Sequence, residues 1–261
     1  MQTKNELGQP VGEPLADWSG ASAPDRTTML GRRCRLEALD ADRHAEALHA
    51  EYCRNSDAAN WTYLPYGPFA SVEEYAQFVT GIQRVGAPCF FAIVDLASET
   101  PVGVASYLRD EPAMGAIEVG HLSYSPALQR TPVSTEAMFL MMKRVFDDWG
   151  YRRYEWKCDS LNGPSVAAAK RLGFRFEGLF RNHVVTKGRN RDTAWFSITE
   201  EEWPAIRVAM ESWLDPTNFD AAGRQRQRLG ELMPQTAGRA IVVNAMGDVN
   251  AKRDVDSRGD D

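Results

Sequence analysis

Two strand-to-helix junctions in the middle of the chain constrain its fold more than any other feature. The first runs from a strand ending near Tyr124, through a loop, into a helix with Ser134-Thr-Glu near its start. The second begins at Asn162, and its short helix stops at Gly173, just before a strand that opens with Phe174. A single capped helix is common, but two junctions separated by one helix and one strand form a specific arrangement. The pattern predicts a mixed sheet covered by helices.

The remaining elements follow from hydrophobic periodicity. Alternating apolar residues predict strands, and apolar residues at helical spacing predict helices. Ser71 followed by Glu74 forms a capping box, which marks a helix start. Gly120 lies inside a predicted strand, where glycine often indicates a bulge. We predict strands over 33–39, 89–95, 101–109, 116–124, 153–159, 176–186 and 192–199, and helices over 41–54, from 71 onward, 135–149 and 164–172.

The 261 residues suffice for one large domain with additional terminal segments. Residues 1–30 are rich in Gly, Pro, Ser and charges, which predicts a flexible N-terminal arm. Residues 31–199 form the predicted domain, and 200–235 a helical extension that packs on the domain or on a second copy in a homodimer. Residues 236–261 have the composition of a disordered tail.

Charge and composition exclude several classes of protein. The formal net charge is −6 without a basic stripe, so we expect no nucleic-acid partner. No apolar run approaches the ~20 residues of a membrane span, and no signal-peptide core is present, so we expect a cytoplasmic protein without a membrane partner. The four cysteines lack metal-ligand or redox spacing. We therefore expect no metal site, and cysteines that act as small buried hydrophobic residues.

The two junctions together resemble the GNAT superfamily of N-acetyltransferases, and within it the branch that acetylates the N-termini of ribosomal proteins. The resemblance covers roughly 33–199, with the specific motifs between Glu118 and Arg181. It implies an α/β (α+β) fold with a mixed, mostly antiparallel twisted sheet of about six or seven strands flanked by helices. It also implies an acyl-CoA-dependent N-acetyltransferase that uses acetyl-CoA as co-substrate and a small-molecule amine or a peptide N-terminus as acceptor.

The resemblance assigns residues to the coenzyme. In the superfamily the first loop wraps the CoA pyrophosphate, although here Pro132 and Ser134 stand where glycines are expected, and proline removes one N–H donor. The backbone amides near Leu122 and Tyr124 would hold the thioester carbonyl and the pantetheine. Asn162 would contact the pantetheine arm and Ser165 would lie near the sulfur. The residues implied at the phosphates are Gln129, Arg130, Thr131, Val133, Ser134 and Thr135.

Two residues are candidates for proton transfer. Glu118 is the candidate base that makes the attacking amine neutral, and the alternative is a solvent-facing strand residue. Many relatives place a tyrosine acid where this chain has Ala169, so Ser165 is the candidate acid toward the leaving thiolate. The alternative for Ser165 is a turn hydroxyl at a helix start. His121 follows in the same strand, and we expect it to be a packed or surface imidazole.

The segment 60–69 combines aromatic residues and prolines in a stiff loop. In the superfamily this region overhangs the acceptor, so an aromatic wall for an amine or a peptide N-terminus is one interpretation. A loop that plugs the edge of the core is the other. At the level of function, the alternatives are a catalytically inactive CoA-binding or protein-interaction domain, and an acyltransferase that uses another acyl-CoA. The candidate acceptor-binding residues are Trp61, Tyr63, Tyr66 and Phe69.

Overall fold

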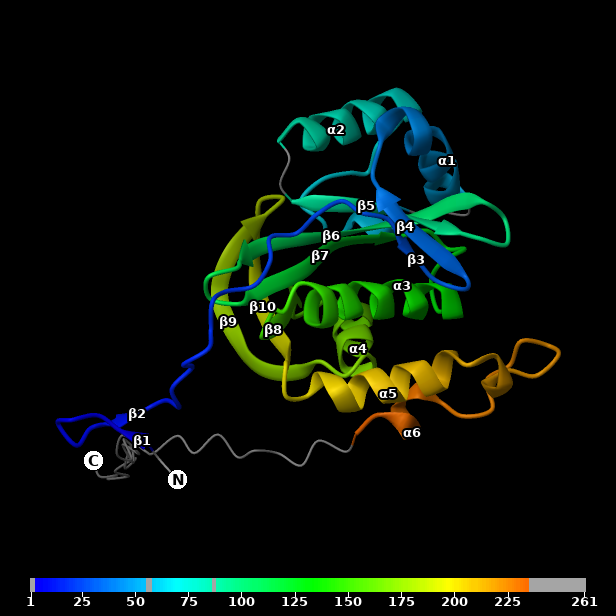
Figure 1. Ribbon diagram of the computed structural model, residues 1–261. Helices are drawn as coiled ribbons and strands as arrows, with labels where there is room; N and C mark the ends of the chain where they lie inside the picture. The colour runs from blue at the N-terminus through cyan, green and yellow to red at the C-terminus, as the bar shows by residue number, and fades with distance from the viewer. Residues whose placement is uncertain (1–2, 55–57, 86–87, 235–261) are drawn as a thin grey trace, which may run out of the picture.

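An eight-stranded sheet runs through the middle of the molecule, with helices on both of its faces (Figure 1). The computed structural model describes residues 3–54, 58–85 and 88–234. Among these residues, β7 and β8 pair in parallel, and every other neighbouring pair in the sheet is antiparallel. In sheet order the strands are β3 (Met29–Leu30), β4 (Cys34–Ala38), β5 (Cys89–Asp95), β6 (Thr100–Glu111), β7 (Ala116–Tyr124), β8 (Arg153–Asp159), β10 (Arg189–Thr199) and β9 (Arg175–Thr186).

The predicted fold class is confirmed: the sheet is mixed, mostly antiparallel and flanked by helices. The expected count of about six or seven strands omits β3, which pairs Met29 with Leu36 of β4 over only two residues. Such a short edge strand leaves no periodic signal in the sequence. A separate hairpin forms from β1 (Thr3–Lys4) and β2 (Pro10–Val11).

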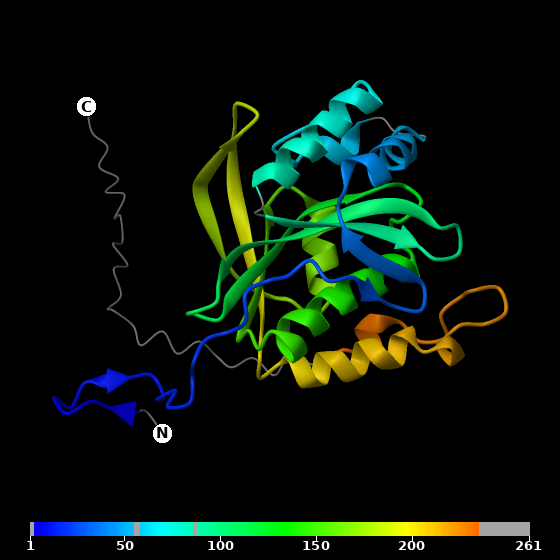
Figure 2. The same ribbon diagram turned by 45° about the horizontal axis from the view of Figure 1, so that its top comes forward.

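The helices divide between the two faces of the sheet, and Figures 1 and 2 show the same division from two directions. In Figure 1, α1 and α2 lie above the sheet and α3, α4 and α5 lie below it. Above the sheet are α1 (Ala41–Cys53), the 3₁₀ turn η1 (Ala59–Trp61) and α2 (Val72–Val85). Below it are α3 (Pro132–Lys143), the π-helical turn η2 (Arg144–Asp148), α4 (Gly163–Arg171), α5 (Trp203–Leu214), the 3₁₀ turn η3 (Pro216–Asn218) and α6 (Leu229–Leu232).

The predicted start of α3 at residue 135 is wrong, because the helix begins three residues earlier. Thr131 is the N-cap, and its Oγ1 accepts the N–H of Ser134 at 3.2 Å. Pro132 takes the first helical position, where a missing N–H is tolerated and the fixed φ suits a helix. Gly173, in contrast, ends α4 as predicted, with a φ of +93° in the left-handed region that favours glycine.

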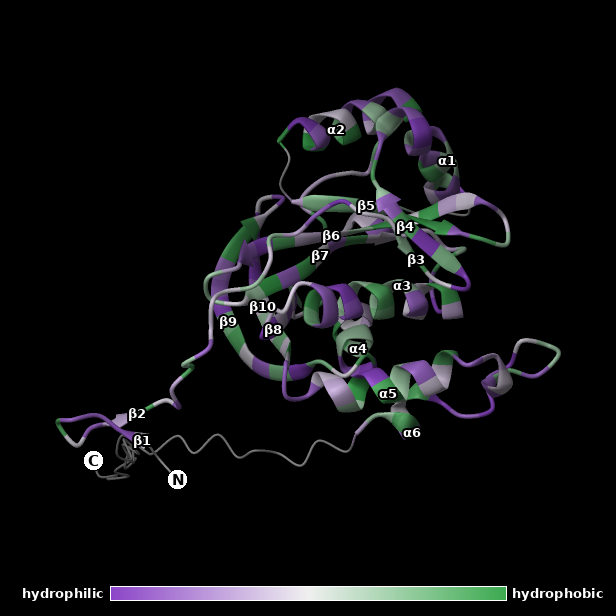
Figure 3. Cartoon of the chain, viewed as in Figure 1, coloured by the Kyte–Doolittle hydropathy of each residue, from purple (hydrophilic) through white to green (hydrophobic). Residues whose placement is uncertain are grey.

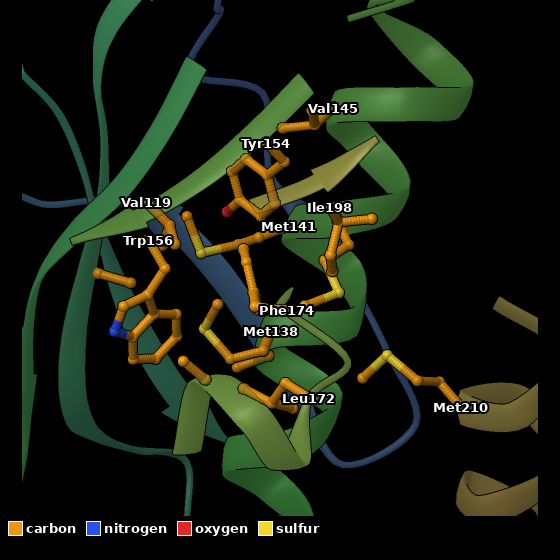
Figure 4. Packing of buried hydrophobic residues seen from close by; sticks show 14 of the residues in the cluster. Val119, Met138, Met141, Val145, Tyr154, Trp156, Leu172, Phe174, Ile198 and Met210 are labelled. Atoms are coloured by element: carbon orange, nitrogen blue, oxygen red, sulfur yellow. The ribbon is translucent and has the colours of Figure 1, made fainter. Parts of the chain in front are cut away.

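Two hydrophobic clusters hold the helices on the sheet. The larger lies between the sheet and helices α3, α4 and α5. Figure 4 shows side chains of β7 and β8 facing Met138 and Met141 of α3. The smaller lies under α1 and α2 and includes Leu48, Trp61 and Phe90. Each large apolar side chain that is fully buried in these clusters contributes roughly 1.5–3 kcal/mol of hydrophobic stabilisation. In Figure 3, by contrast, hydrophobic and hydrophilic residues are intermixed along the edge strand β9.

The prediction of a flexible arm over 1–30 is wrong for its second half, which packs on the domain. The indole Nε1 of Trp18 donates to the carbonyl of Ala113 at 2.9 Å. The N–H of Ser22 donates to the carbonyl of Trp149 at 2.8 Å, and β3 follows in the sheet. Short polar segments carry little local signal, so their tertiary hydrogen bonds could not be anticipated from composition.

The C-terminal extension packs on the domain through α5. The indole of Trp203 stacks on Phe146, with ring centroids 5.2 Å apart, and Ile206 and Met210 join the larger cluster. This is the first of the two packing arrangements predicted for 200–235. The predicted disordered tail 236–261 lies outside the described residues.

A buried carboxylate ties the start of the domain to α3. Glu136 is 4% exposed and accepts backbone N–H groups from Arg32 at 3.1 Å, Arg33 at 2.6 Å and Cys34 at 2.9 Å. A Cβ at Gly31 would lie 2.5 Å from Glu136 Oε2, so the turn between β3 and β4 requires glycine there. One side chain therefore satisfies three backbone donors, two of them partly buried and the third, at Cys34, fully buried.

We expect Glu136→Ala to lower the free energy of unfolding by about 3 kcal/mol, because it leaves buried N–H groups unsatisfied. Chemical denaturation measures the change. Glu211→Ala is the matched control, since Glu211 makes only an exposed i,i+4 pair with Arg207 at 2.9 Å, and it should cost less than about 0.5 kcal/mol. Equal losses in the two variants would contradict the role given to Glu136.

Candidate functional site

Strands β7 and β8 pair over their first halves and then separate. The parallel register runs from Ala116↔Arg153 to Val119↔Trp156 and ends there. Beyond that point β7 continues to pair with β6 and β8 continues to pair with β10. The facing edges of the two strands thus lose their mutual hydrogen bonds, and their backbone groups become available to another molecule.

A β-bulge in β7 lies at the point of separation. Ser106 of β6 pairs with Gly120 and Val104 pairs with Ser123, so β7 carries one extra residue in this interval. His121 has a φ of +51°, in the left-handed region that is rare for residues other than glycine. A bulge bends its strand and increases the local twist. The bulge predicted from Gly120 is therefore confirmed, and it turns the end of β7 away from β8.

Two helices start beside the separated strands. Because β7 and β8 are parallel, the loops that follow them leave the sheet at the same edge and lead into α3 and α4. Asn162 caps α4, and its Oδ1 accepts the N–H of Ser165 at 3.2 Å. Arg171 of α4 donates to Thr135 Oγ1 in the first turns of α3 at 3.0 Å. The unpaired N–H groups at such helix starts attract anions.

The residues expected at the phosphates do not all face the start of α3. Arg130 is exposed and has a φ of +61°, and Val133 and Ser134 belong to the first turn. Thr131 is occupied as the N-cap, as described above. Thr135 is buried against Arg171, and the Gln129 side chain turns toward the α1–α2 loop. Of the predicted set, the residues from Arg130 to Ser134 lie together at the start of α3, whereas the side chains of Gln129 and Thr135 make their contacts elsewhere.

The Ser165 hydroxyl lies beside Trp156 on the strand that has left β7. Its Oγ accepts a hydrogen bond from the indole Nε1 of Trp156 at 3.0 Å. A serine that accepts from an indole can still donate its own hydrogen, which here also lies within reach of the Cys158 thiol. Ala169, one turn further along α4, is fully buried. Trp156 was not predicted as the hydrogen-bond partner of Ser165, although its alternation with Tyr154 placed both side chains on the same face of β8.

Glu118 is a buried member of a chain of ion pairs that reaches the surface. The carboxylate is 3% exposed, and its Oε2 accepts from Arg109 Nη1 at 2.7 Å and from Lys157 Nζ at 2.8 Å. Lys157 also contacts Glu155 at 2.7 Å and lies 3.8 Å from the ring centroid of Trp195. Although burial raises the pKa of Glu155, hydrogen bonds from Lys157 and Arg153 give a net lowering. The alternative of a solvent-facing Glu118 is wrong.

The four aromatic candidates of the α1–α2 loop, which spans 58–71, divide into two pairs. Trp61 is 5% exposed and packs in the smaller cluster against Tyr52 and Phe69, so both loop residues plug the edge of the core. Tyr66 stacks on His121 of β7, with ring centroids 5.6 Å apart. Tyr63 donates to the carbonyl of Leu161, just after β8, at 3.0 Å. Tyr63 and Tyr66 are thus the pair that reaches the separated strands.

The tip of the β9–β10 hairpin also touches the α1–α2 loop. Lys187 Nζ donates to the carbonyl oxygens of Trp61 at 2.7 Å and Gly67 at 2.8 Å. In Figure 2 the hairpin rises beside the helices that this loop joins. Segments more than 100 residues apart in the sequence therefore meet over the same part of the sheet.

Within residues 3–54, 58–85 and 88–234, no group of three His, Cys, Asp or Glu side chains has a metal-binding arrangement. No helix in these ranges is long and apolar enough to cross a membrane. All four cysteines are free thiols. Cys34 and Cys158 are buried and Cys89 is half-buried, but Cys53 is exposed, contrary to the expectation for the set.

The part of the chain that forms this site matches a known protein family. The family model described as an acetyltransferase (GNAT) domain matches residues 33–175, more than half of the chain. The chain belongs to the GNAT acetyltransferase family. The matched range contains the separated strands and both helix starts, and it ends where β9 begins.

Solved structures give the same result. A GCN5-related N-acetyltransferase from Brucella melitensis is 45% identical, with a TM-score of 0.82, over 84% of this chain and 99% of that one. A probable acetyltransferase of the GNAT family from Chromobacterium violaceum is 40% identical, with a TM-score of 0.70, over 76% and 98% of the two chains. The ribosomal alpha-N-protein acetyltransferase RimL is 22% identical, with a TM-score of 0.56, over 66% and 94%, which shows the shared fold. This GNAT protein is an acyl-CoA-dependent acetyltransferase.

His121 of this GNAT domain gives a testable pH dependence. Burial, followed by the nearby Arg109 guanidinium, lowers the pKa of His121 from 6.5 to about 4. The folded protein therefore binds the proton less readily than the unfolded chain, so stability decreases as the pH falls from 6.5 toward 4.

In His121→Gln this contribution is absent. Denaturation at a series of pH values should give a free energy of unfolding that falls less steeply in the variant, by at most about 1.4 kcal/mol per pH unit. The two slopes should coincide above pH 7. Identical slopes between pH 6.5 and 4 would show that the imidazole does not have the lowered pKa.

Proposed function

We propose that this GNAT acetyltransferase transfers an acetyl group from acetyl-CoA to a primary amine by direct attack in a ternary complex. The observation that carries the proposal is the separation of β7 from β8 after Val119, beside the starts of α3 and α4. Separated strands provide backbone donors and acceptors for an extended amide-containing arm, and a helix start suits a pyrophosphate. The proposed acceptor is a small-molecule amine or a protein N-terminus.

The residues at the separated strands fit an acyl-CoA. Val133 and Ser134 belong to the first turn of α3, and the exposed Arg130 precedes it. Pro132 removes one N–H, and Thr131 already occupies the N–H of Ser134. We therefore propose that Arg130 provides the main charge-assisted contact to the phosphates. When bound, acetyl-CoA supplies a thioester whose carbonyl carbon is open to attack by an amine.

The proposed mechanism uses residues on both separated strands. The amine nitrogen attacks the thioester carbonyl, and the backbone amides near Leu122 and Tyr124 stabilise the oxygen as it becomes negative. The carbon–sulfur bond then breaks, the Ser165 hydroxyl donates a hydrogen bond to the departing thiolate, and the thiolate takes up the proton that the attacking nitrogen loses. Asn162 holds the pantetheine arm through its amide nitrogen, since its Oδ1 is engaged with Ser165 N–H.

Glu118 is the proposed base. Its Oε2 already accepts from two cations, so we propose that Oε1 takes the proton of the acceptor ammonium, directly or through a water. The alternative of a catalytically inactive CoA-binding domain rests on Pro132 in the phosphate loop alone, and the acetyltransferase family of the chain weighs against it. Use of another acyl-CoA is the second candidate.

The proposal extends to the class of acceptor and to a second copy of the chain as partner. RimL acts on a ribosomal protein, and the resemblance of 162–178 to that branch supports a peptide N-terminus as acceptor. A homodimer is also proposed, because the edge strand β9 leaves Phe176 55% and Val185 77% exposed. A cytoplasmic location without a nucleic-acid or membrane partner remains the expectation from the sequence.

Binding of acetyl-CoA tests the proposal first. At about 1 mM, acetyl-CoA should raise the melting temperature, because a ligand selective for the folded state stabilises it by mass action. A panel of amines and peptides should then identify an acceptor that releases the CoA thiol. Binding without thiol release from any acceptor would favour the inactive domain. An unchanged melting temperature would contradict the acyl-CoA assignment.

Glu118→Gln tests the base. Turnover at pH 7 should fall by ~10²-fold, with smaller losses at higher pH, where more of the amine is already neutral. Glu155→Gln is the matched control, because it removes a carboxylate from the same lysine, Lys157, without touching the proposed proton path. The control should retain turnover within about threefold at every pH. Similar losses in both variants would assign Glu118 to the ion network alone.

A further inference from the structure

Two side-chain amides join the α1–α2 loop to the loop before α3. Gln129 Nε2 donates to Asn60 Oδ1 at 2.8 Å and to the carbonyl of Tyr124 at 3.0 Å. Asn60 Nδ2 donates to the same carbonyl at 3.1 Å. We name these three hydrogen bonds the Asn60–Gln129 clasp; two of them end on the carbonyl of Tyr124, the last residue of β7, and the third joins the two side chains.

The clasp lies where the two separated strands end. Tyr124 closes the part of β7 that has left β8, and Tyr63 of the α1–α2 loop binds the carbonyl of Leu161 just after β8. The loop is therefore hydrogen-bonded to the ends of both strands. Lys187 holds the same loop from the hairpin side. The clasp joins this loop to the segment leading into α3.

The amide chemistry of Gln129 decides between two roles. A side-chain amide nitrogen has two hydrogens, and both of those on Gln129 are used in the clasp. They cannot bind a phosphate unless the clasp opens. We propose that Gln129 and Asn60 are positioning residues that fix the α1–α2 loop, with Tyr63 and Tyr66, over the acceptor side of the site, and that Gln129 is not a phosphate ligand.

This inference rests on the proposed function only in taking the α1–α2 loop as the acceptor side. If the two residues position the loop, their loss should change KM, kcat and the CoA affinity to different extents. Loss of the clasp should loosen the loop and raise the KM for the amine acceptor, whereas kcat and the affinity for CoA should change little. A phosphate ligand would give the opposite division, because a charge-assisted contact to the coenzyme would be lost.

The test uses Asn60→Ala, Gln129→Ala and the double variant, with Asn5→Ala as the matched control. Asn5 also makes an amide–amide hydrogen bond, to Gln9 at 3.0 Å, but in the exposed β1–β2 hairpin. Hydrogen exchange of the amides in 61–67 measures how firmly the loop is held. Calorimetry with CoA alone measures the coenzyme affinity, and initial rates with the best amine of a panel give KM and kcat.

Each single variant should raise the exchange of the loop amides and the acceptor KM about fivefold, the effect of losing a typical hydrogen bond. The double variant should add little to either single one, because the same clasp is already broken. The CoA affinity should stay within about twofold, and Asn5→Ala should match the wild type throughout.

The proposal is overturned if Gln129→Ala weakens CoA binding tenfold or more while loop exchange is unchanged. It is also overturned if the effects of the two single variants simply add. Should the wild-type protein acetylate no amine, the proposed function fails, but the exchange and calorimetry still decide whether the clasp holds the loop and whether Gln129 contacts the coenzyme.

Discussion

The site depends on one interruption of hydrogen bonding, the separation of β7 from β8 after Val119. Buried backbone groups need partners, so a sheet does not open between central strands without compensation. The bulge at His121 turns β7, and the backbone of β7 finds its other partners in β6. The packed clusters on both faces hold the sheet in this form. The separation leaves the facing strand edges unpaired beside the starts of α3 and α4. These unpaired edges provide a place for an extended acyl donor.

The face of the sheet opposite α3 carries a chain of ion pairs as well as the smaller hydrophobic cluster. Positive and negative side chains alternate along this chain from β6 through β7 and β8 to β9, and every N–O distance lies between 2.5 and 2.8 Å. Neither the exposed nor the buried pairs of this chain contribute much net stability, so their value lies in fixing side chains in place. Here the chain of pairs fixes Glu118 beside the bulge, while the α1–α2 loop and the hairpin tip cover the same region. The members, in order, are Arg109, Glu118, Lys157, Glu155, Arg153 and Glu177.

Local signals in the sequence predicted the fold well and the site only in part. Strands β7 and β8 have their predicted bounds, and Gly120 and Gly173 indicated a bulge and a helix end that the structure contains. Residues whose roles depend on distant partners could not be predicted. Gln129 binds Asn60, which lies 69 positions earlier, and Lys157 binds Glu118 of another strand. The alternation of 153–159 showed that Lys157 shares a face with Glu155, but no periodicity indicates what lies opposite.

Hydrogen exchange of the backbone amides, measured with and without acetyl-CoA, reports where the coenzyme contacts the main chain. We expect strong protection of the β7 amides from Gly120 to Tyr124 and of Val133, with little change in β4 and β5 or at Ser134, whose N–H already binds Thr131. A second region, the cavity lined by Gly173, Ile206 and Met233, serves as an internal reference. Protection of that cavity, or of no part of β7, would contradict the claim that the separated strands form the acyl-CoA site.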